Sequence, residues 1–117
     1  MGSKVGAKRE ARSQAAAAIP VAASLRVLRG FYEGLEIPVD RDRIVIGRGR
    51  RADIVIPEST MSRQHAAVGY GEEGFFVEDL GSTNGTLVNG EAQKRAPLHD
   101  GDEIRLGKLH LQLRFVS

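Results

Sequence analysis

From Leu25 onward, the apolar residues of this 117-residue chain fall into short runs that are separated by glycines and polar turns. Some runs alternate apolar and polar positions, as half-buried strands do, and others are consecutive aliphatic residues, as in fully buried strands. The clearest alternation is that of Leu109, Leu111, Leu113 and Phe115. The 3.6-residue apolar period of an amphipathic helix is absent after residue 25.

We expect a strand at each run, with strands recurring roughly every 8–12 residues as in a β-sandwich. The runs are residues 25–28, 35–39, 44–46, 54–56, 65–70, 75–80, 86–88, 104–106 and 109–115. Pro38 predicts a sheet edge, because proline cannot donate to a neighbouring strand. Asn89-Gly90 predicts a two-residue hairpin, because both residues tolerate positive φ. The pattern therefore predicts an all-β sandwich.

Residues 1–24 have a different composition, rich in Ala, Ser, Gly, Lys and Arg and without aromatic residues. Such a segment buries too little apolar surface to offset the entropy of ordering. We therefore expect a disordered, basic, alanine-rich leader at 1–24 and one folded domain at 25–117. The leader carries four basic residues and one acidic residue, whereas the remainder carries 13 basic and 14 acidic residues. Nucleic-acid binding is thus not expected of the domain, although a role for the leader stays open.

Composition excludes several other classes of protein. The chain has no cysteine, so neither a disulfide framework nor a thiolate metal site is expected. No apolar run approaches the ~18 residues of a membrane-spanning helix. The histidines and carboxylates show no metal-ligand spacing, so we expect no metal and no cofactor. We expect a monomeric, cytoplasmic domain.

Arg48 directly follows the run 44–46 and Gly47, at the point where a buried strand gives way to a loop. Its guanidinium can form a bidentate pair with phosphate oxygens. A solvated position or an ion pair with Glu58 is the alternative. Arg50 and Arg51 could add positive potential or contact acidic residues of a ligand, with solvated surface positions as their alternative.

A second polar loop contains Ser62, Arg63 and His65. The serine hydroxyl and nearby backbone N–H groups can complete a phosphate cradle, although a turn-capping role is the simpler alternative. Arg63 can point to a ligand or pack across the loop. His65 could serve Ser62 as a catalytic base, but it begins a predicted strand and no Gly-x-Ser-x-Gly elbow is present. We therefore expect His65 to bind loop backbone and fix Ser62.

The third loop is Ser82-Thr83-Asn84-Gly85-Thr86. The amide of Asn84 offers the donor and acceptor that a peptide backbone requires. Thr83 adds a hydroxyl for phosphate, and Gly85 permits a tight turn. The loop is neither a Walker A loop nor a dinucleotide-binding turn, because the required glycine and lysine spacing is absent.

These motifs, in this order, resemble a forkhead-associated (FHA) domain over roughly residues 25–115. The resemblance implies a sandwich of about eleven strands with functional loops at one end. It implies that Arg48, Ser62, Arg63, Thr83 and Asn84 contact a phosphothreonine peptide, and that Gly47, His65 and Gly85 shape the loops. FHA domains belong to the phospho-motif readers.

The expected function is thus a non-enzymatic, phosphothreonine-dependent interaction module that docks onto partners phosphorylated by Ser/Thr kinases. The alternative is a phospho-independent structural sandwich in a larger complex, such as a secretion apparatus. Loss of phosphate dependence in a pull-down would favour that alternative.

Overall fold

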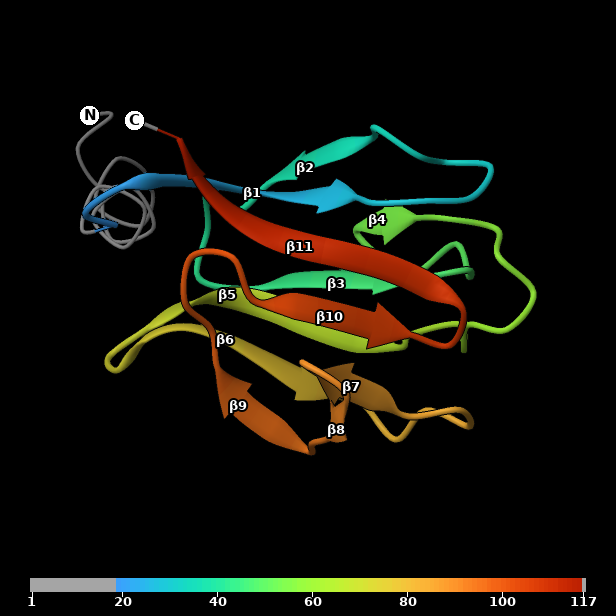
Figure 1. The fold of residues 1–117 in the computed structure, drawn as a ribbon. Coiled ribbons are helices and arrows are strands. Elements are labelled where there is room, and N and C mark those ends of the chain that lie inside the picture. The colour runs from blue at the N-terminus through green and yellow to red at the C-terminus, as the bar shows by residue number, and fades with distance from the viewer. Residues whose placement is uncertain (1–18, 117) are drawn as a thin grey trace, which may run out of the picture.

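The computed structural model describes residues 19–116, which form eleven strands in two sheets packed face to face (Figure 1). The six-stranded sheet has the order β2-β1-β11-β10-β7-β8, and the five-stranded sheet has the order β4-β3-β5-β6-β9. The predicted all-β sandwich of about eleven strands is confirmed. Among the described residues, no helix is long and apolar enough to cross a membrane.

The strands of the first sheet are β1 (Ala22–Val27), β2 (Glu36–Pro38), β7 (Thr86–Val88), β8 (Glu91–Ala92), β10 (Glu103–Leu106) and β11 (Leu109–Val116). Those of the second are β3 (Ile44–Gly47), β4 (Ile54–Val55), β5 (Ala66–Gly71), β6 (Gly74–Asp79) and β9 (Arg95–Pro97). Every pair is antiparallel except β3 with β4.

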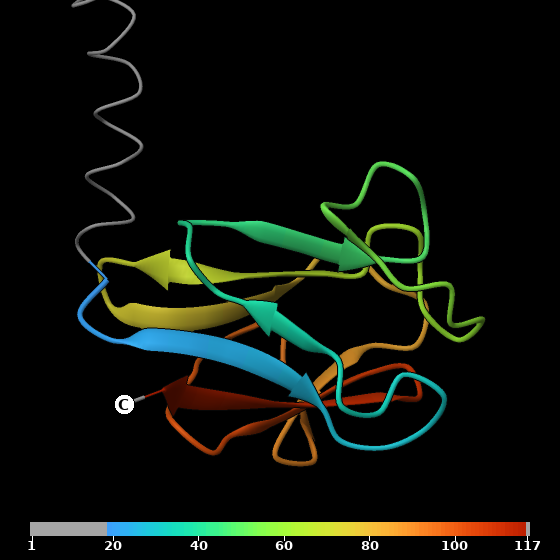
Figure 2. The ribbon, with the colours of Figure 1, turned by 90° about the horizontal axis from the view of Figure 1, so that it is seen from above.

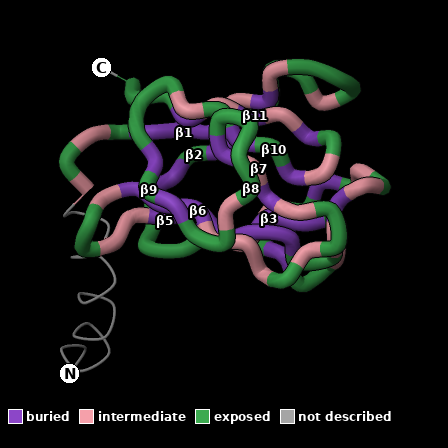
Figure 3. The backbone as a smooth tube through the Cα atoms, turned by 60° about the horizontal axis from the view of Figure 1, so that its bottom comes forward, coloured by how far each residue is buried: buried purple, intermediate pink, exposed green. Residues whose placement is uncertain are grey.

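The core lies between the two sheets and is built from aliphatic side chains on alternate strand positions. In Figure 3 the strands carry the buried stretches of the chain, whereas the connections are mostly exposed. The first sheet contributes Leu25, Val27, Ile104, Leu106, Leu111 and Leu113, and the second contributes Ile44, Ile46, Ala66, Val68 and Val77. Because both sheets present aliphatic faces, the sandwich closes with few aromatic residues.

The domain begins earlier than the sequence predicts. Strand β1 starts at Ala22, inside the expected leader, and Ala22 pairs with Val116 of β11. Ala23 and Ser24 are buried. Small residues give little strand signal on their own, but β1 lies between β2 and β11 and receives hydrogen bonds from both. Residues 1–18, the rest of the expected leader, lie outside the described residues.

Two predicted details are confirmed and others differ. Strand β2, with Pro38, is a sheet edge, and Asn89 and Gly90 form the β7–β8 hairpin with φ of 50° and 89°. Phe115 continues the apolar alternation of β11 but is 39% exposed, because the buried pattern ends at Leu113. Strands β8 and β9 have no apolar run and were not predicted individually.

The connections β3–β4, β4–β5, β6–β7 and β10–β11 gather at one end of the sandwich (Figures 1 and 2). Residues 19 and 116 lie toward the opposite end, where β1 begins and β11 finishes. Strands distant in sequence thus deliver the three predicted polar loops to the same place.

Candidate functional site

The β3–β4 and β4–β5 loops are joined by backbone hydrogen bonds. The N–H of Arg48 donates to the carbonyl of Ser62 and the N–H of Gly49 to that of Arg63, both at 3.1 Å. These bonds continue the antiparallel pairing of β3 with β5 beyond the ends of the strands. Main-chain hydrogen bonds consequently hold Arg48 and Ser62 side by side.

Two glycines make this close approach possible. A Cβ atom on Gly47 would lie 2.0 Å from the carbonyl oxygen of Arg63, and one on Gly49 would lie 2.8 Å from the Cβ of Arg63. The first of these neighbours is backbone and cannot rotate away. Gly47 is therefore required by the contact between the two loops, which gives its expected loop-shaping role a physical reason.

His65 connects the β4–β5 loop to the β6–β7 loop and is fully buried. Its Nδ1 accepts from the N–H of Ser62 at 3.0 Å, and its Nε2 lies 2.8 Å from the carbonyl oxygen of Gly85. A backbone N–H can only donate and a carbonyl can only accept, so these partners assign the proton to Nε2. Both ring nitrogens are engaged by backbone, which argues against His65 as a base for the Ser62 hydroxyl.

The hydroxyl of Ser62 forms one hydrogen bond with the third loop. Its Oγ accepts a hydrogen bond from the N–H of Thr83 at 3.0 Å. Because the oxygen accepts this bond, the hydroxyl proton remains available for an acceptor outside the protein. The side chain of Thr83 is exposed beside it. The Ser62 hydroxyl and the backbone of Thr83 therefore meet where the two loops join.

Asn84 joins the third loop to the β4–β5 loop. Its Nδ2 donates to the carbonyl of Thr60 at 2.7 Å, which leaves Oδ1 and the second amide hydrogen for a ligand. Thr60 is itself held by the carboxylate of Glu58 and by the N–H of Lys108, which donates to Thr60 Oγ1 at 2.7 Å. The sequence reasoning assigned no such anchoring role to Thr60.

Glu58 does not pair with Arg48, the alternative considered from sequence. Its carboxylate accepts hydrogen bonds from the hydroxyl and the N–H of Thr60, which hold the pKa of Glu58 below its ordinary value. Arg48 is exposed and donates from Nε to the carbonyl of Met61 at 2.6 Å. This bond orients the guanidinium and leaves its terminal N–H groups for a ligand.

A depression of about 750 Å³ begins beside Arg48. It is lined by Arg48, Gly49, Arg50, Arg51, Arg63, Gln64 and Leu80, and none of these residues is acidic. In residues 19–116, no group of three or more His, Asp or Glu side chains could hold a metal ion. The groups that the three loops bring together are guanidinium, hydroxyl and amide groups, which can hydrogen-bond an anion.

Comparison with known proteins identifies the family. The profile of the FHA domain matches residues 44–107. The chain belongs to the FHA domain family. It is similar to the oxoglutarate dehydrogenase inhibitor of Corynebacterium efficiens, with 38% identity over 94 residues that cover 80% of this chain and 66% of the relative.

A second relative is the glycogen accumulation regulator GarA of Mycobacterium tuberculosis, 39% identical over 92 residues that cover 79% of this chain and 57% of GarA. A structure solved in a study of phosphothreonine-dependent FHA domain interactions is similar to this FHA domain with a TM-score of 0.74 and 31% identity. That similarity covers 82% of this chain and 98% of the other. The chain spans 66% of the first relative and 57% of GarA, less than two thirds of either.

Asp79 anchors the β6–β7 loop of this FHA domain, a role that the sequence reasoning missed. Its Oδ1 accepts from Ser82 Oγ at 2.6 Å and from Thr86 Oγ1 at 2.7 Å, and its Oδ2 accepts from two backbone N–H groups at 3.0 Å. Burial raises the pKa of Asp79, but these hydrogen bonds outweigh burial and hold the pKa below its ordinary value. An aspartate before a Gly-Ser turn is the local signal that could have revealed the anchor.

We expect Asp79→Asn to destabilise the FHA domain by about 1–3 kcal/mol at pH 7, because the new amide N–H₂ faces donors. Because folding lowers the pKa of Asp79, its carboxylate stabilises the folded state above the unfolded-state pKa of about 3.9. This stabilisation is lost as the pH falls through the folded-state pKa. The difference in unfolding free energy between parent and variant should therefore shrink in acid. Denaturant titrations at several pH values measure it, with Asp42→Asn, at an exposed position, as the control.

Proposed function

We propose that this FHA domain is a phosphothreonine-dependent docking module for proteins phosphorylated by Ser/Thr kinases. The observation that carries the proposal is the convergence of Arg48, Ser62, Thr83 and Asn84 from three loops, with hydrogen-bond donors left over for an anion. Family membership and the similarity to an FHA domain with phosphothreonine-dependent interactions support it.

Each group has a distinct part in the proposed complex. The terminal N–H groups of Arg48 bind the phosphate, and the hydroxyls of Ser62 and Thr83 donate to its remaining oxygens. The amide of Asn84 binds the backbone of the peptide. Arg63 adds a further polar contact at the rim. Gly47, His65 and Gly85 do not touch the ligand but keep the three loops in place.

The site is arranged before a ligand arrives. Backbone bonds join the first two loops, His65 joins the second to the third, and Asn84 does so again. A ligand that binds a preorganised site does not have to order these loops, which favours affinity for a short peptide.

The module acts by binding and not by catalysis in this proposal. Both named relatives are regulators or inhibitors by description. Both ring nitrogens of His65 are hydrogen-bonded to backbone groups, so neither is available to the hydroxyl of Ser62. We place the docking in the cytoplasm, where kinases have access to ATP, and expect a monomeric domain to bind one phosphothreonine segment of its partner.

Calorimetry with matched phosphothreonine, phosphoserine and unphosphorylated peptides tests the proposal. We expect the phosphothreonine peptide to bind most tightly, the phosphoserine peptide more weakly and the unphosphorylated peptide not measurably. One buried methyl group is worth only about 1 kcal/mol, so discrimination against phosphoserine should be moderate unless the methyl also restricts the rotamer.

The same titrations at two pH values separate phosphate recognition from other binding. The second pKa of the phosphate is about 6, so below that pH the ligand loses one of its two charges while Arg48 stays charged. Affinity should therefore fall as the pH drops below about 6. Equal binding of all three peptides would contradict the proposal and favour a phospho-independent structural sandwich.

Asn84→Ala should weaken every phosphopeptide by a similar factor, about three- to tenfold, because hydrogen bonds to backbone carry no side-chain selectivity. The variant also loses the bond to Thr60, so its melting temperature must be measured alongside. A library of peptides with varied flanking residues provides the readout. If the variant altered only which flanking residues are preferred, the backbone role of Asn84 would be wrong.

A further inference from the structure

Four arginines line the depression beside the proposed phosphate site, namely Arg48, Arg50, Arg51 and Arg63. Within residues 19–116, none of the four forms a salt bridge with a carboxylate. Some arginines elsewhere on the domain do so: those with a carboxylate partner are Arg26, Arg41, Arg43 and Arg95. Arg29, Arg105 and Arg114 also have no carboxylate partner among the described residues, so what distinguishes this surface is that four such arginines line one depression.

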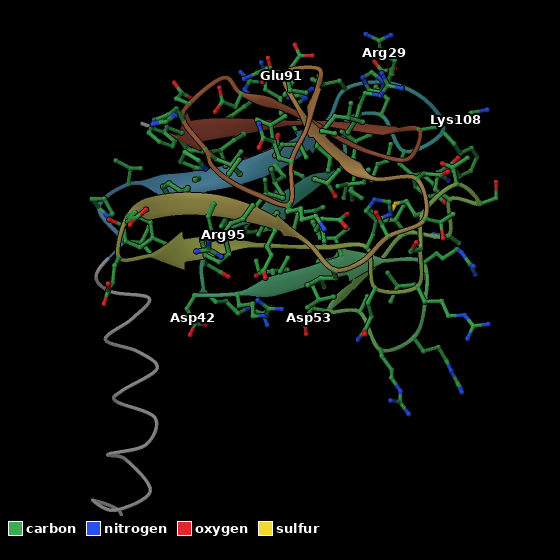
Figure 4. All side chains as sticks on the ribbon, turned by 90° about the horizontal axis from the view of Figure 1, so that it is seen from below. Arg29, Asp42, Asp53, Glu91, Arg95 and Lys108 are labelled. Carbon is green, nitrogen blue, oxygen red and sulfur yellow. The ribbon has the colours of Figure 1, made fainter. Side chains whose placement is uncertain are left out.

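The acidic residues that are near in sequence are occupied elsewhere. The carboxylate of Asp53 accepts from the N–H of Val45 at 2.8 Å, and Figure 4 shows Asp53 beside the five-stranded sheet, on the same side as Asp42. Glu58 is bound to Thr60. Asp79 is bound to its own loop. None of these carboxylates neutralises the arginine cluster.

Main-chain contacts keep the arginines crowded despite their mutual repulsion. The bonds from Arg48 N to Ser62 O and from Gly49 N to Arg63 O fix the two loops against each other. The Cβ and Cγ of Arg63 lie against Gly49, where no side chain intervenes. The rigid pairing of the loops, and not a ligand, thus maintains a concentration of positive charge.

This charge exceeds what one phosphothreonine supplies. A phosphate ester carries a charge of about −1.5 to −2 at pH 7, whereas the depression carries four guanidinium groups. We propose, building on the function above, that Arg50 and Arg51 recognise additional negative charge in the segment flanking the phosphothreonine. The charge can come from carboxylates or from a second phosphate group on the same peptide.

The arginine depression is separate from the amide that is proposed to bind the peptide backbone. Asn84 is hydrogen-bonded to Thr60, but neither residue lines the arginine depression. A peptide whose backbone is bound by Asn84 can therefore reach Arg50 and Arg51 only with the flank that runs toward the depression. Acidic residues should raise affinity on one flank of the phosphothreonine and have little effect on the other.

Binding of four phosphothreonine peptides tests this inference: one with neutral flanks, one acidic on the N-terminal flank, one acidic on the C-terminal flank, and one with a second phosphothreonine on the flank that responds. We expect one acidic peptide and the doubly phosphorylated peptide to bind about three- to tenfold more tightly than the neutral peptide at low salt. The gain should shrink with added salt, because exposed charges are screened.

The double substitution Arg50→Gln and Arg51→Gln should abolish this gain while leaving affinity for the neutral phosphopeptide within about twofold. Arg114→Gln, an exposed position on β11 at the opposite end of the sandwich, is the matched control and should retain the gain.

Two results would overturn the inference alone: no gain from acid on either flank in the parent, or a gain that survives the double substitution. Competition by a short single-stranded oligonucleotide as strong as by the acidic peptide would also overturn it, since the cluster would then be a general polyanion site. Failure of the neutral phosphopeptide to bind would instead overturn the proposed function itself, and this inference with it.

Discussion

Arg48→Ala should lower the affinity for a phosphothreonine peptide by about 10- to 100-fold while leaving the domain folded. A charged, bidentate hydrogen bond is worth about 1.5–3 kcal/mol, which corresponds to that range. The side chain is exposed and contributes little to the core. The variant also loses the bond from Nε to Met61, so the melting temperature should be recorded beside the calorimetric affinity.

Arg48→Lys separates charge from shape. Lysine keeps the positive charge but lacks the planar fork and the Nε donor, so its affinity should lie between those of parent and alanine variant. Full affinity in the alanine variant, with unchanged melting, would remove Arg48 from the proposed phosphate site. Full affinity in the lysine variant alone would show that charge suffices and that the bidentate geometry is unnecessary.

Gly47→Ala should be the most damaging single-methyl change near the site. The new Cβ would lie 2.0 Å from the carbonyl oxygen and 2.6 Å from the carbonyl carbon of Arg63, so the two loops must move apart. Overpacking of this kind costs typically 1–3 kcal/mol, and the backbone on both sides places this case at the upper end. We expect the melting temperature to fall by roughly 10 °C or more and phosphopeptide affinity to fall with it.

Gly71→Ala is the matched control, because its Cβ would meet only ring atoms of Phe76 at 3.7 and 3.8 Å, an ordinary contact distance. Its stability and affinity should remain close to those of the parent. Equal melting of the Gly47 and Gly71 variants would show that the paired loops are softer than the structure indicates.

The strands that were predicted are those in which the sequence itself carries a long enough apolar signal. Residues 44–46 and 109–115 fall in β3 and β11, because aliphatic runs of this kind have to be buried. The start of β1 at Ala22 was missed, since alanine and serine become strand residues there only through pairing with β2 and β11. The short edge strand β9 depends in the same way on pairing with β6.

In the candidate site, too, some features could be predicted from local sequence and others depend on contacts between distant segments. The chemical character of Arg48, Ser62 and Asn84, and the loops that carry them, were readable from short motifs. The contacts that hold the loops were not: Asn84 reaches Thr60 across 24 positions, and the N–H of Lys108 reaches the hydroxyl of Thr60 across 48. Contacts of such range depend on the packing of the sheets, about which local sequence carries little information.

Because Ala22 pairs with Val116, the first and last strands meet at one end of the sandwich. This pairing determines where any attached segment of chain starts. A chain that continues from residue 19 or residue 116 starts at the end of the sandwich away from the three loops (Figures 1 and 2). Strand β11 has 8 residues, and an extended chain advances about 3.3 Å per residue, so a tail needs roughly eight residues merely to run back along the sandwich. A phosphorylated residue attached closer than that cannot occupy the loops in cis, whereas a neighbouring domain or a solid support attached there leaves them unobstructed.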